Sequence, residues 1–142
     1  MYRHILIPTD GSELAEHGVA HGLALAKSLA AKISVIFVVE PFSELTGRFL
    51  EVVATYAELR REQAASVLSS AANAAKEAGL SCEVIQVEHE QPHQAIIAAA
   101  EEKGCDLIVM SSHGRSGLSN LLVGSVTNKV LAHTKTPVLV CR

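Results

Sequence analysis

Hydrophobic residues along the chain fall into five short runs, separated by longer segments that have a helical repeat. The runs are rich in Val, Ile and Leu and predict β-strands at residues 3–9, 32–39, 81–87, 106–111 and 137–141. Three of them are almost uninterrupted by polar residues, which is typical of strands buried on both faces of a parallel sheet. The segments between the runs predict helices at residues 12–30, 50–78, 92–103 and 125–133.

This alternation of strands and helices predicts the fold class. We expect an α/β protein with a five-stranded, parallel, open twisted sheet, right-handed crossovers and helices on both faces. Pro92 at the first position of the third predicted helix and Gly104 just after its end support that helix. Since no repeat or low-complexity linker divides the sequence, we expect a single domain over residues 1–142.

Composition and charge exclude several classes of protein. With 142 residues, of which 49% are hydrophobic and 19% charged, the chain can bury a core and is not a disordered polymer. The net charge of -3 argues against general binding to nucleic acids or anionic membranes. The sequence contains no apolar stretch near the roughly 18 to 20 residues of a membrane span, and its N-terminal apolar run is too short for a signal peptide. We therefore expect a cytoplasmic protein.

The three cysteines support a reducing compartment. Cys82, Cys105 and Cys141 are odd in number and widely spaced, and they form no C-x-x-C pair. This pattern is neither a disulfide framework nor a zinc ribbon. We expect reduced, inert thiols in or beside the predicted strands.

Ligands of open parallel sheets bind outside the carboxyl ends of the strands, where the strand order reverses. This rule selects the loops at residues 9–12, 39–41, 88–91 and 112–124. The last loop is rich in glycine and leads through Gly124 and Ser125 into a helix, whose free N–H groups from Val126 and Thr127 onward can receive an anion. Arg115 adds a guanidinium group. The combination favours a polyphosphate site, and the alternative is a plain glycine-rich turn in which Ser125 is only a helix N-cap.

Other phosphate-binding and catalytic motifs are absent from the sequence. It contains neither G-x-x-x-x-G-K-[ST] nor G-x-G-x-x-G, which excludes a Walker A loop and a Rossmann dinucleotide fingerprint. His113 stands beside Ser111 and Ser112, but the G-x-S-x-G elbow of a Ser–His hydrolase does not occur. A phosphoreceiver domain requires an acidic pair after its first strand, where this chain has Asp10 alone. We therefore predict no catalytic residue.

Two histidine patterns have a weak resemblance to metal sites. His17 and His21 are four residues apart and share one face of a predicted helix, but a third ligand is not evident. His89 and His93 are separated by Pro92, which breaks the helical register between them. A solvated or interface pair is favoured for the first pattern, and a polar loop before a helix for the second.

Residues 4–13 and 110–142 resemble the universal stress protein family, and more narrowly its ATP-binding branch. That branch carries G-x2-G-x9-G-[ST] between the fourth strand and the fourth helix, and this chain has Ser111-x2-Gly114-x9-Gly124-Ser125. The resemblance extends over the whole chain in the order of the elements, and it implies the Rossmann-like fold of the adenine nucleotide alpha hydrolases. One departure is that Ser111 stands where the motif has its first glycine.

The resemblance implies a site for ATP or ADP at the carboxyl ends of the first and fourth strands. The residues implied to contact the nucleotide are Pro8, Thr9, Asp10, Val38, Met110, Ser111, Gly114, Arg115, Gly124, Ser125, Val126 and Thr127. Mg²⁺ or Mn²⁺ would be held mainly through the phosphates, because no pair of carboxylates presents itself. Asp10 also fits an acidic helix cap three residues before Glu13, so it has two expected roles.

The implied function is that of a nucleotide-responsive stress regulator with little or slow hydrolysis. The alternative is a dimeric interaction module of the same fold that binds no nucleotide. Ser111 favours the alternative, while the retained spacing of Gly114, Gly124 and Ser125 favours binding. If the motif glycine is the better residue, Ser111→Gly leaves the affinity unchanged or raises it.

The apolar strand from Pro137 to Cys141 ends the sequence and would expose a pairing surface at a sheet edge. We therefore expect a homodimer formed through this strand. The protein partner and the stress signal are not identified by the sequence.

Overall fold

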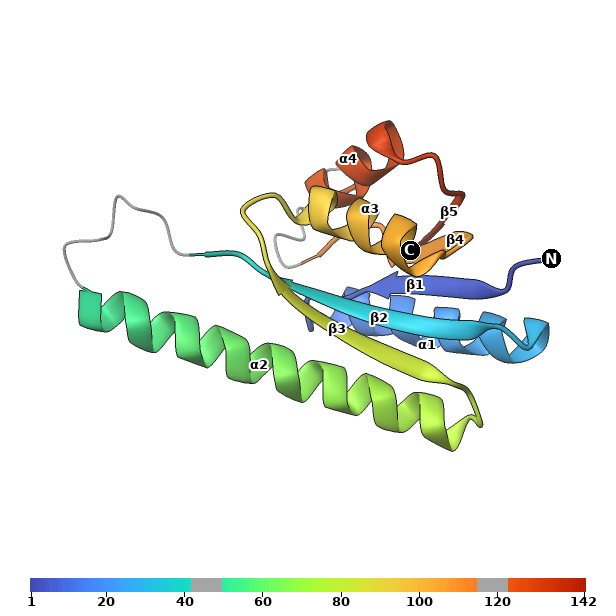
Figure 1. The fold of residues 1–142 in the computed structure, drawn as a ribbon, viewed down its shortest axis with the longest axis horizontal. Helices are drawn as coiled ribbons and strands as arrows, with labels where there is room; N and C mark the ends of the chain where they lie inside the picture. Colours follow the sequence, from blue (N-terminus) through green and yellow to red (C-terminus); the bar gives the residue numbers. More distant parts are fainter. Residues whose placement is uncertain (42–49, 115–122) are drawn as a thin grey trace.

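The predicted alternation of strands and helices is confirmed in the computed structural model, which describes residues 1–41, 50–114 and 123–142 (Figure 1). The strands are β1 (His4–Pro8), β2 (Lys32–Val39), β3 (Cys82–Glu88), β4 (Leu107–Ser111) and β5 (Val138–Cys141). The helices are α1 (Glu13–Leu29), α2 (Leu50–Glu77), α3 (Pro92–Lys103) and α4 (Ser125–His133). The observed ends of these elements differ from the predicted ends by at most one residue.

The five strands form one parallel sheet, as predicted, and their order in the sheet is β3-β2-β1-β4-β5. From β1 the chain adds β2 and β3 on one side, and it then crosses to β4 and β5 on the other side. The strand order therefore reverses between β1 and β4. The connections that leave these two carboxyl ends run to opposite faces of the sheet, and a crevice at this point is where such sheets bind ligands.

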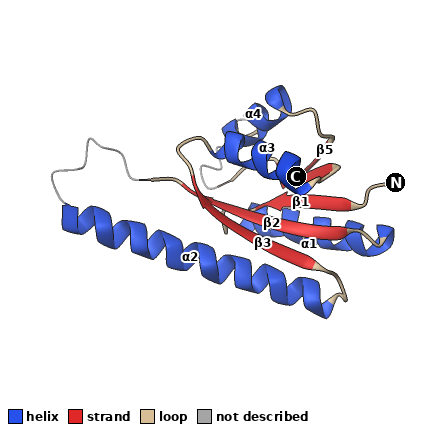
Figure 2. Cartoon of the chain, in the orientation of Figure 1, coloured by secondary structure: helices blue, strands red, loops and turns tan. Residues whose placement is uncertain are grey.

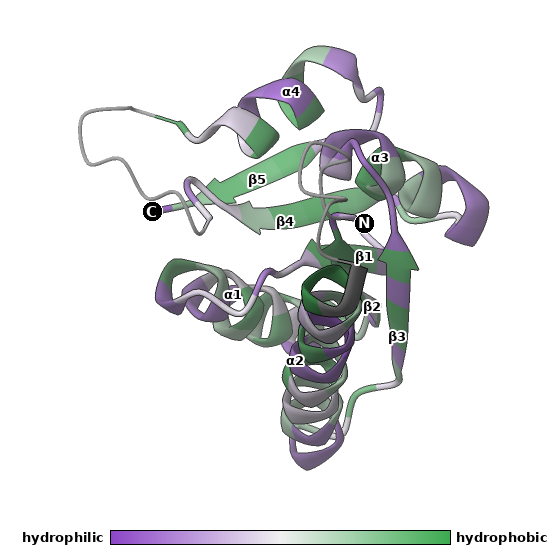
Figure 3. Cartoon of the chain, turned by 90° about the vertical axis from the view of Figure 1, so that its left-hand side faces the viewer, coloured by the Kyte–Doolittle hydropathy of each residue, from purple (hydrophilic) through white to green (hydrophobic). Residues whose placement is uncertain are grey.

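Helices cover both faces of the sheet (Figure 2). The helices α1 and α2 lie on one face, and α3 and α4 lie on the other. Successive side chains of a strand point to opposite faces, so Ile7 and Phe37 pack toward α1 and α2, whereas Leu6 and Ile36 pack toward α3. The central strands β1, β2 and β4 are almost wholly buried, and Figure 3 shows their hydrophobic colouring. This agrees with the uninterrupted apolar runs in the sequence.

Two glycines let α1 lie close to the sheet. Gly18 and Gly22 are buried on its inner face. A Cβ atom at Gly22 would lie 2.9 Å from Cγ1 of Ile7, and a Cβ atom at Gly18 would lie 3.2 Å from the backbone nitrogen of Ser111. Because these positions carry no side chain, the helix approaches the carboxyl end of β4 directly.

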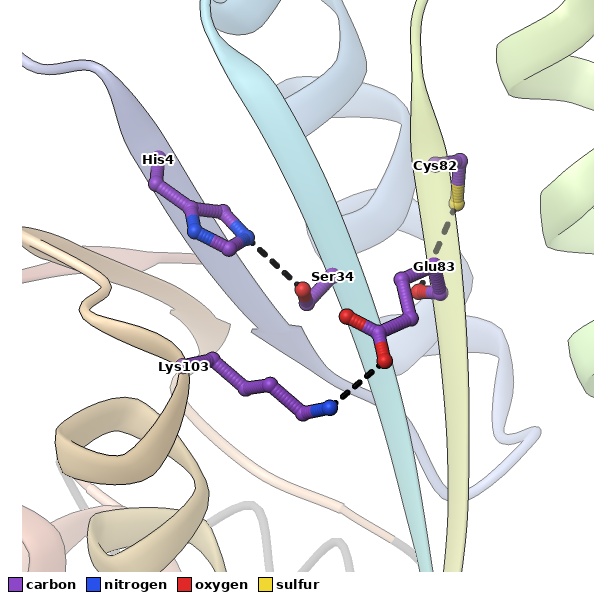
Figure 4. A network of polar contacts seen from close by, with 5 residues as sticks. All are labelled: His4, Ser34, Cys82, Glu83 and Lys103. Carbon is purple, nitrogen blue, oxygen red and sulfur yellow. Dashed lines mark hydrogen bonds and ion pairs between the residues drawn. The ribbon is translucent and has the colours of Figure 1, made fainter.

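Polar contacts tie the strands together near their amino ends (Figure 4). The hydroxyl of Ser34 is fully buried and shares a hydrogen bond of 2.8 Å with Nε2 of His4, which satisfies a polar group inside the sheet. Nζ of Lys103 donates to Oε1 of Glu83 at 2.6 Å, linking the end of α3 to β3. The carboxylate of Asp106 accepts hydrogen bonds from the backbone N–H groups of Arg3 and His4, which brings β1 and β4 into register.

Candidate functional site

A cavity of about 250 Å³ lies at the carboxyl edge of the sheet, where β1 and β4 diverge. Its volume is close to the lower end of small-molecule sites. The residues that line it are Pro8, Thr9, Asp10, Ala15, Ile36, Val38, Glu40, Pro92, Ile96, Met110, Ser111, Gly114, Gly124, Ser125, Val126 and Thr127. Eleven of the twelve residues predicted for the site are among them. The twelfth, Arg115, lies outside the described residues.

One wall of the cavity is apolar. Ile36 and Val38 project from β2, Met110 from β4 and Ile96 from α3, and Pro8 ends β1 beside them. Ile36 and Val38 are two residues apart on the same strand, so they face the same side of the sheet. A planar, uncharged group fits this wall, because it can be buried there without leaving polar atoms unpaired.

The N-terminus of α4 forms the opposite, polar end of the cavity. Its N-cap is Gly124, with φ -67° and ψ 163°, and this residue has no side chain to accept from the first turn. The N–H groups of Ser125, Val126 and Thr127 therefore have no acceptor within the helix, and they carry the positive end of its dipole. The alternative in which Ser125 is only the N-cap does not hold, because Gly124 takes that position and Ser125 is the exposed first residue of the helix.

Residues Ser112 to Gly114 directly follow β4, and we call this segment the strap. The backbone nitrogen of Ser112 donates to the carbonyl oxygen of Cys141 at 2.7 Å, which fixes one side of the strap to the end of β5. The hydroxyl of Thr127 donates to the carbonyl oxygen of Ser111 at 2.8 Å, which fixes β4 to the first turn of α4. The polar end is thus held by neighbours on both sides.

Asp10 belongs to a turn between β1 and α1. Its Oδ1 accepts from the backbone nitrogen of Ser12 at 3.0 Å, and the hydroxyl of Ser12 accepts from Ala15 at 3.2 Å. The N-cap of α1 is therefore Ser12, and the prediction that Asp10 caps this helix is wrong. The carboxylate of Asp10 lies against Gly114 of the strap, because a Cβ atom at Gly114 would collide with it. Asp10 thus contacts the strap from the β1 side of the cavity.

The structure adds five residues to the site that the sequence reasoning did not name: Ala15, Ile36, Glu40, Pro92 and Ile96. A signal for two of them was available, because Ile36, Val38 and Glu40 alternate along one strand and its extension. Glu40 adds a second acidic residue to the lining of the cavity, in addition to Asp10.

The histidines of the chain show no catalytic arrangement in the described residues. Nδ1 of His113 is 3.1 Å from the hydroxyl of Ser112, but its Nε2 is buried and meets no polar partner there, so no carboxylate orients the ring. His17 and His21 are exposed on α1. Within the described part of the chain, no group of three or more His, Cys, Asp or Glu side chains is arranged to hold a metal ion.

A separate histidine contact joins α3 to α4. The ring centroids of His93 and His133 lie 5.6 Å apart. Burial lowers the pKa of His93 below its ordinary value, and the nearby Lys129, His133 and His89 lower it further. His93 directly follows Pro92, a residue of the cavity wall.

The fold is that of an α/β protein with a cavity where the strand order of its parallel sheet reverses. The chain matches the universal stress protein family over residues 1–142. It is 34% identical over 149 residues to the universal stress protein YxiE of Bacillus subtilis, and the match covers 100% of each chain. The chain therefore belongs to the universal stress protein family.

Solved structures give the same fold. The structure of MJ0577, a universal stress protein of Methanocaldococcus jannaschii, matches with a TM-score of 0.83 and 31% identity, over 99% of this chain and 95% of that one. A universal stress protein solved in complex with cAMP matches with a TM-score of 0.74 and 25% identity, over 99% of this chain and 97% of that one. The predicted Rossmann-like fold of the adenine nucleotide alpha hydrolases is thus confirmed. Among the described helices, none is long and apolar enough to cross a membrane.

Proposed function

We propose that this chain binds ATP or ADP in the cavity at the carboxyl ends of β1 and β4 and acts as a nucleotide-responsive stress regulator. The observation that carries the proposal is that one cavity joins an apolar wall, two carboxylates and the free N-terminus of a helix. These features match the base, the ribose and the phosphates of a nucleotide, in that order. The related protein in complex with cAMP supports an adenine nucleotide as the ligand.

The proposed nucleotide lies across the cavity. Its adenine packs on the wall formed by Ile36, Val38 and Met110, and its ribose hydroxyls face Asp10 at the end of β1. Its phosphates meet the strap at Gly114 and the first turn of α4, where N–H groups and the helix dipole favour negative charge.

Mg²⁺ or Mn²⁺ would accompany the phosphates. The described residues offer no cluster of three ligands, so the ion would be held mainly by phosphate oxygens. A bound ion would offset phosphate charge beside Asp10 and Glu40.

Hydrolysis of the bound nucleotide should be slow or absent. A hydrolase needs a general base within reach of the attacking water. His113 is the histidine of the strap, but its Nε2 is buried and His113 is not among the residues that line the cavity. The proposed role is therefore to respond to nucleotide binding and not to turn the nucleotide over.

A calorimetric titration with ATP, ADP, AMP and adenosine, each in the presence of Mg²⁺, tests the proposal. We expect affinity to rise with the number of phosphates, because the polar end of the cavity binds them. Equal affinity for adenosine and ATP would contradict the placement of the phosphates at α4. An absence of binding at millimolar concentrations of all four compounds would reject the nucleotide site and favour the dimeric interaction module.

We also propose that the chain forms a homodimer through β5. This strand lies at one edge of the sheet, and its Leu139 side chain is 38% exposed, so it presents an apolar, unpaired edge. Leu139→Lys should shift the mass measured by light scattering from dimer to monomer. Leu131→Lys, at a leucine of α4 that is 43% exposed, is the matched control and should remain a dimer. A wild-type monomer at micromolar concentration would contradict the proposal.

The cytoplasm is the compartment we propose. Cys82, Cys105 and Cys141 are free thiols, and unpaired cysteines are usual where glutathione keeps thiols reduced. Fractionation of cells that express the tagged chain tests this, and recovery in the periplasmic or membrane fraction would contradict it.

A further inference from the structure

Ser111 stands where the family motif has a glycine, and the structure shows where its side chain lies. Neighbouring residues of a strand point to opposite faces, so Met110 points into the cluster between the sheet and α3, whereas Ser111 points toward α1. A Cβ atom at Gly18 of α1 would lie 3.6 Å from Cβ of Ser111. Ser111 therefore lies beside Gly18, on the α1 side of the sheet.

The hydroxyl of Ser111 makes a defined contact with the strap. Its Oγ donates to the carbonyl oxygen of His113 at 2.8 Å, and Ser111 is 7% exposed. A glycine at this position has no donor and would leave that carbonyl oxygen without this bond. The hydrogen bond closes a short turn over Ser112 and His113, and this turn sets where the following Gly114 lies beside Asp10.

We propose that Ser111 is a positioning residue that holds the strap in the conformation that receives phosphates. This inference rests on the proposed nucleotide site. A loop already held in its bound conformation loses less freedom when the ligand arrives, so the hydrogen bond from the Ser111 hydroxyl to the carbonyl oxygen of His113 strengthens binding. On this proposal Ser111→Gly lowers the affinity for ATP, which is the opposite of the outcome expected from the motif alone.

Ser111→Ala is the variant that tests this, because it keeps Cβ and removes only the hydroxyl. The net contribution of one such hydrogen bond corresponds to a loss of about 3- to 10-fold in affinity for ATP. Adenosine has no phosphates to reach the strap, so the affinity of the variant for adenosine should fall by less than about twofold. A general loosening of the fold would weaken the binding of ATP and of adenosine alike. A larger loss for ATP than for adenosine therefore identifies a role of Ser111 in positioning the strap.

Ser28→Ala is the matched control. The hydroxyl of Ser28 also donates to a backbone carbonyl, that of Leu25 at 2.9 Å, but it lies near the far end of α1. Removing the hydroxyl of Ser28 should change neither the affinity for ATP nor the affinity for adenosine. An unchanged ATP affinity in Ser111→Ala, with the wild type binding ATP, would overturn the positioning role and leave the nucleotide site standing.

Amide hydrogen exchange tests the positioning role of Ser111 independently of nucleotide binding. In the chain without nucleotide, the amides of residues 112–114 should exchange at least about threefold faster in Ser111→Ala than in the wild type. Exchange that is unchanged by the substitution would overturn the inference even if the wild type binds ATP. If the wild type binds no nucleotide, the proposed function fails, and faster exchange would still establish that Ser111 holds the strap.

Discussion

Replacing Ser125 by glutamate places a carboxylate at the first residue of α4, where the proposed site receives phosphates. Ser125 is exposed and lines the cavity, so a longer side chain can enter solvent without disturbing the core. Gly124 is a less selective target, because a Cβ atom there would lie 3.1 Å from the carbonyl oxygen of Ser112 and 3.2 Å from Cα of His113. A substitution at Gly124 would displace the strap as well as obstruct the ligand.

The expected loss of affinity follows from the geometry of the cavity end. At a separation of about 6 Å and an effective dielectric constant of about 40, between protein surface and water, each pair of like unit charges costs about 1.4 kcal/mol, or about tenfold. Two phosphate charges near α4 therefore predict a loss of about 100-fold for ATP. The same carboxylate stabilises the N-terminus of the helix by about 0.3–1 kcal/mol, so the free energy of unfolding should be unchanged or slightly higher.

Calorimetric titration with Mg-ATP and thermal unfolding measure these two effects. Ser125→Gln is the control, because it has the shape of glutamate without the charge, and it should bind ATP nearly as well as the wild type. A weaker Ser125→Glu variant with an unchanged or higher Tm supports phosphate binding at α4. Equal ATP affinities for the glutamate and glutamine variants would refute the reasoning.

Four further predictions concern stability and reactivity. Ala30 ends α1 with φ 55°, so Ala30→Gly should raise the free energy of unfolding in urea by about 0.5–1 kcal/mol. Gly104 ends α3 with φ 69° and has open space around it, so Gly104→Ala should lower the free energy of unfolding by a similar amount. A lower free energy of unfolding for Ala30→Gly, or a higher one for Gly104→Ala, would contradict the corresponding prediction. The lowered pKa of His93 means that the unfolded state binds more protons as pH falls through 6.5, so stability decreases there. His93→Gln should flatten this dependence in urea titrations between pH 5 and pH 8, and an unchanged slope would contradict it. Burial raises the pKa of Cys105 to about 11, so its thiol should resist alkylation at pH 8 until the chain unfolds, and rapid labelling of the native protein would contradict this.

The fold was predictable from sequence because its signals are local and agree with one another. The apolar runs of β1, β2 and β4 are continuous, since these strands are buried on both faces, and Pro92 and Gly104 bracket α3. The end of α1 had no such signal. Ala30 takes the left-handed conformation that glycine usually supplies, and its backbone nitrogen still bonds to the carbonyl oxygens of Ala26 and Lys27.

The residues of the site were easier to predict than their roles. Eleven of the residues named from the motif and from the position of the strand ends line one cavity. Three details, however, depend on tertiary contacts. Ser12 and not Asp10 caps α1, because the Asp10 carboxylate bonds to Ser12 in a preceding turn. Glu40 enters the cavity through the alternation of β2. The side chain of Ser111 lies beside Gly18, on a helix far away in sequence.

The most direct test of the account is to extract the freshly purified chain, identify any released nucleotide by mass spectrometry, and then titrate the nucleotide-free protein with Mg-ATP. The account predicts ATP or ADP in the extract, or binding in the micromolar range with a stoichiometry of one per chain. An empty extract together with no heat of binding at millimolar Mg-ATP would contradict it, and the function would then have to be sought on the edge of β5.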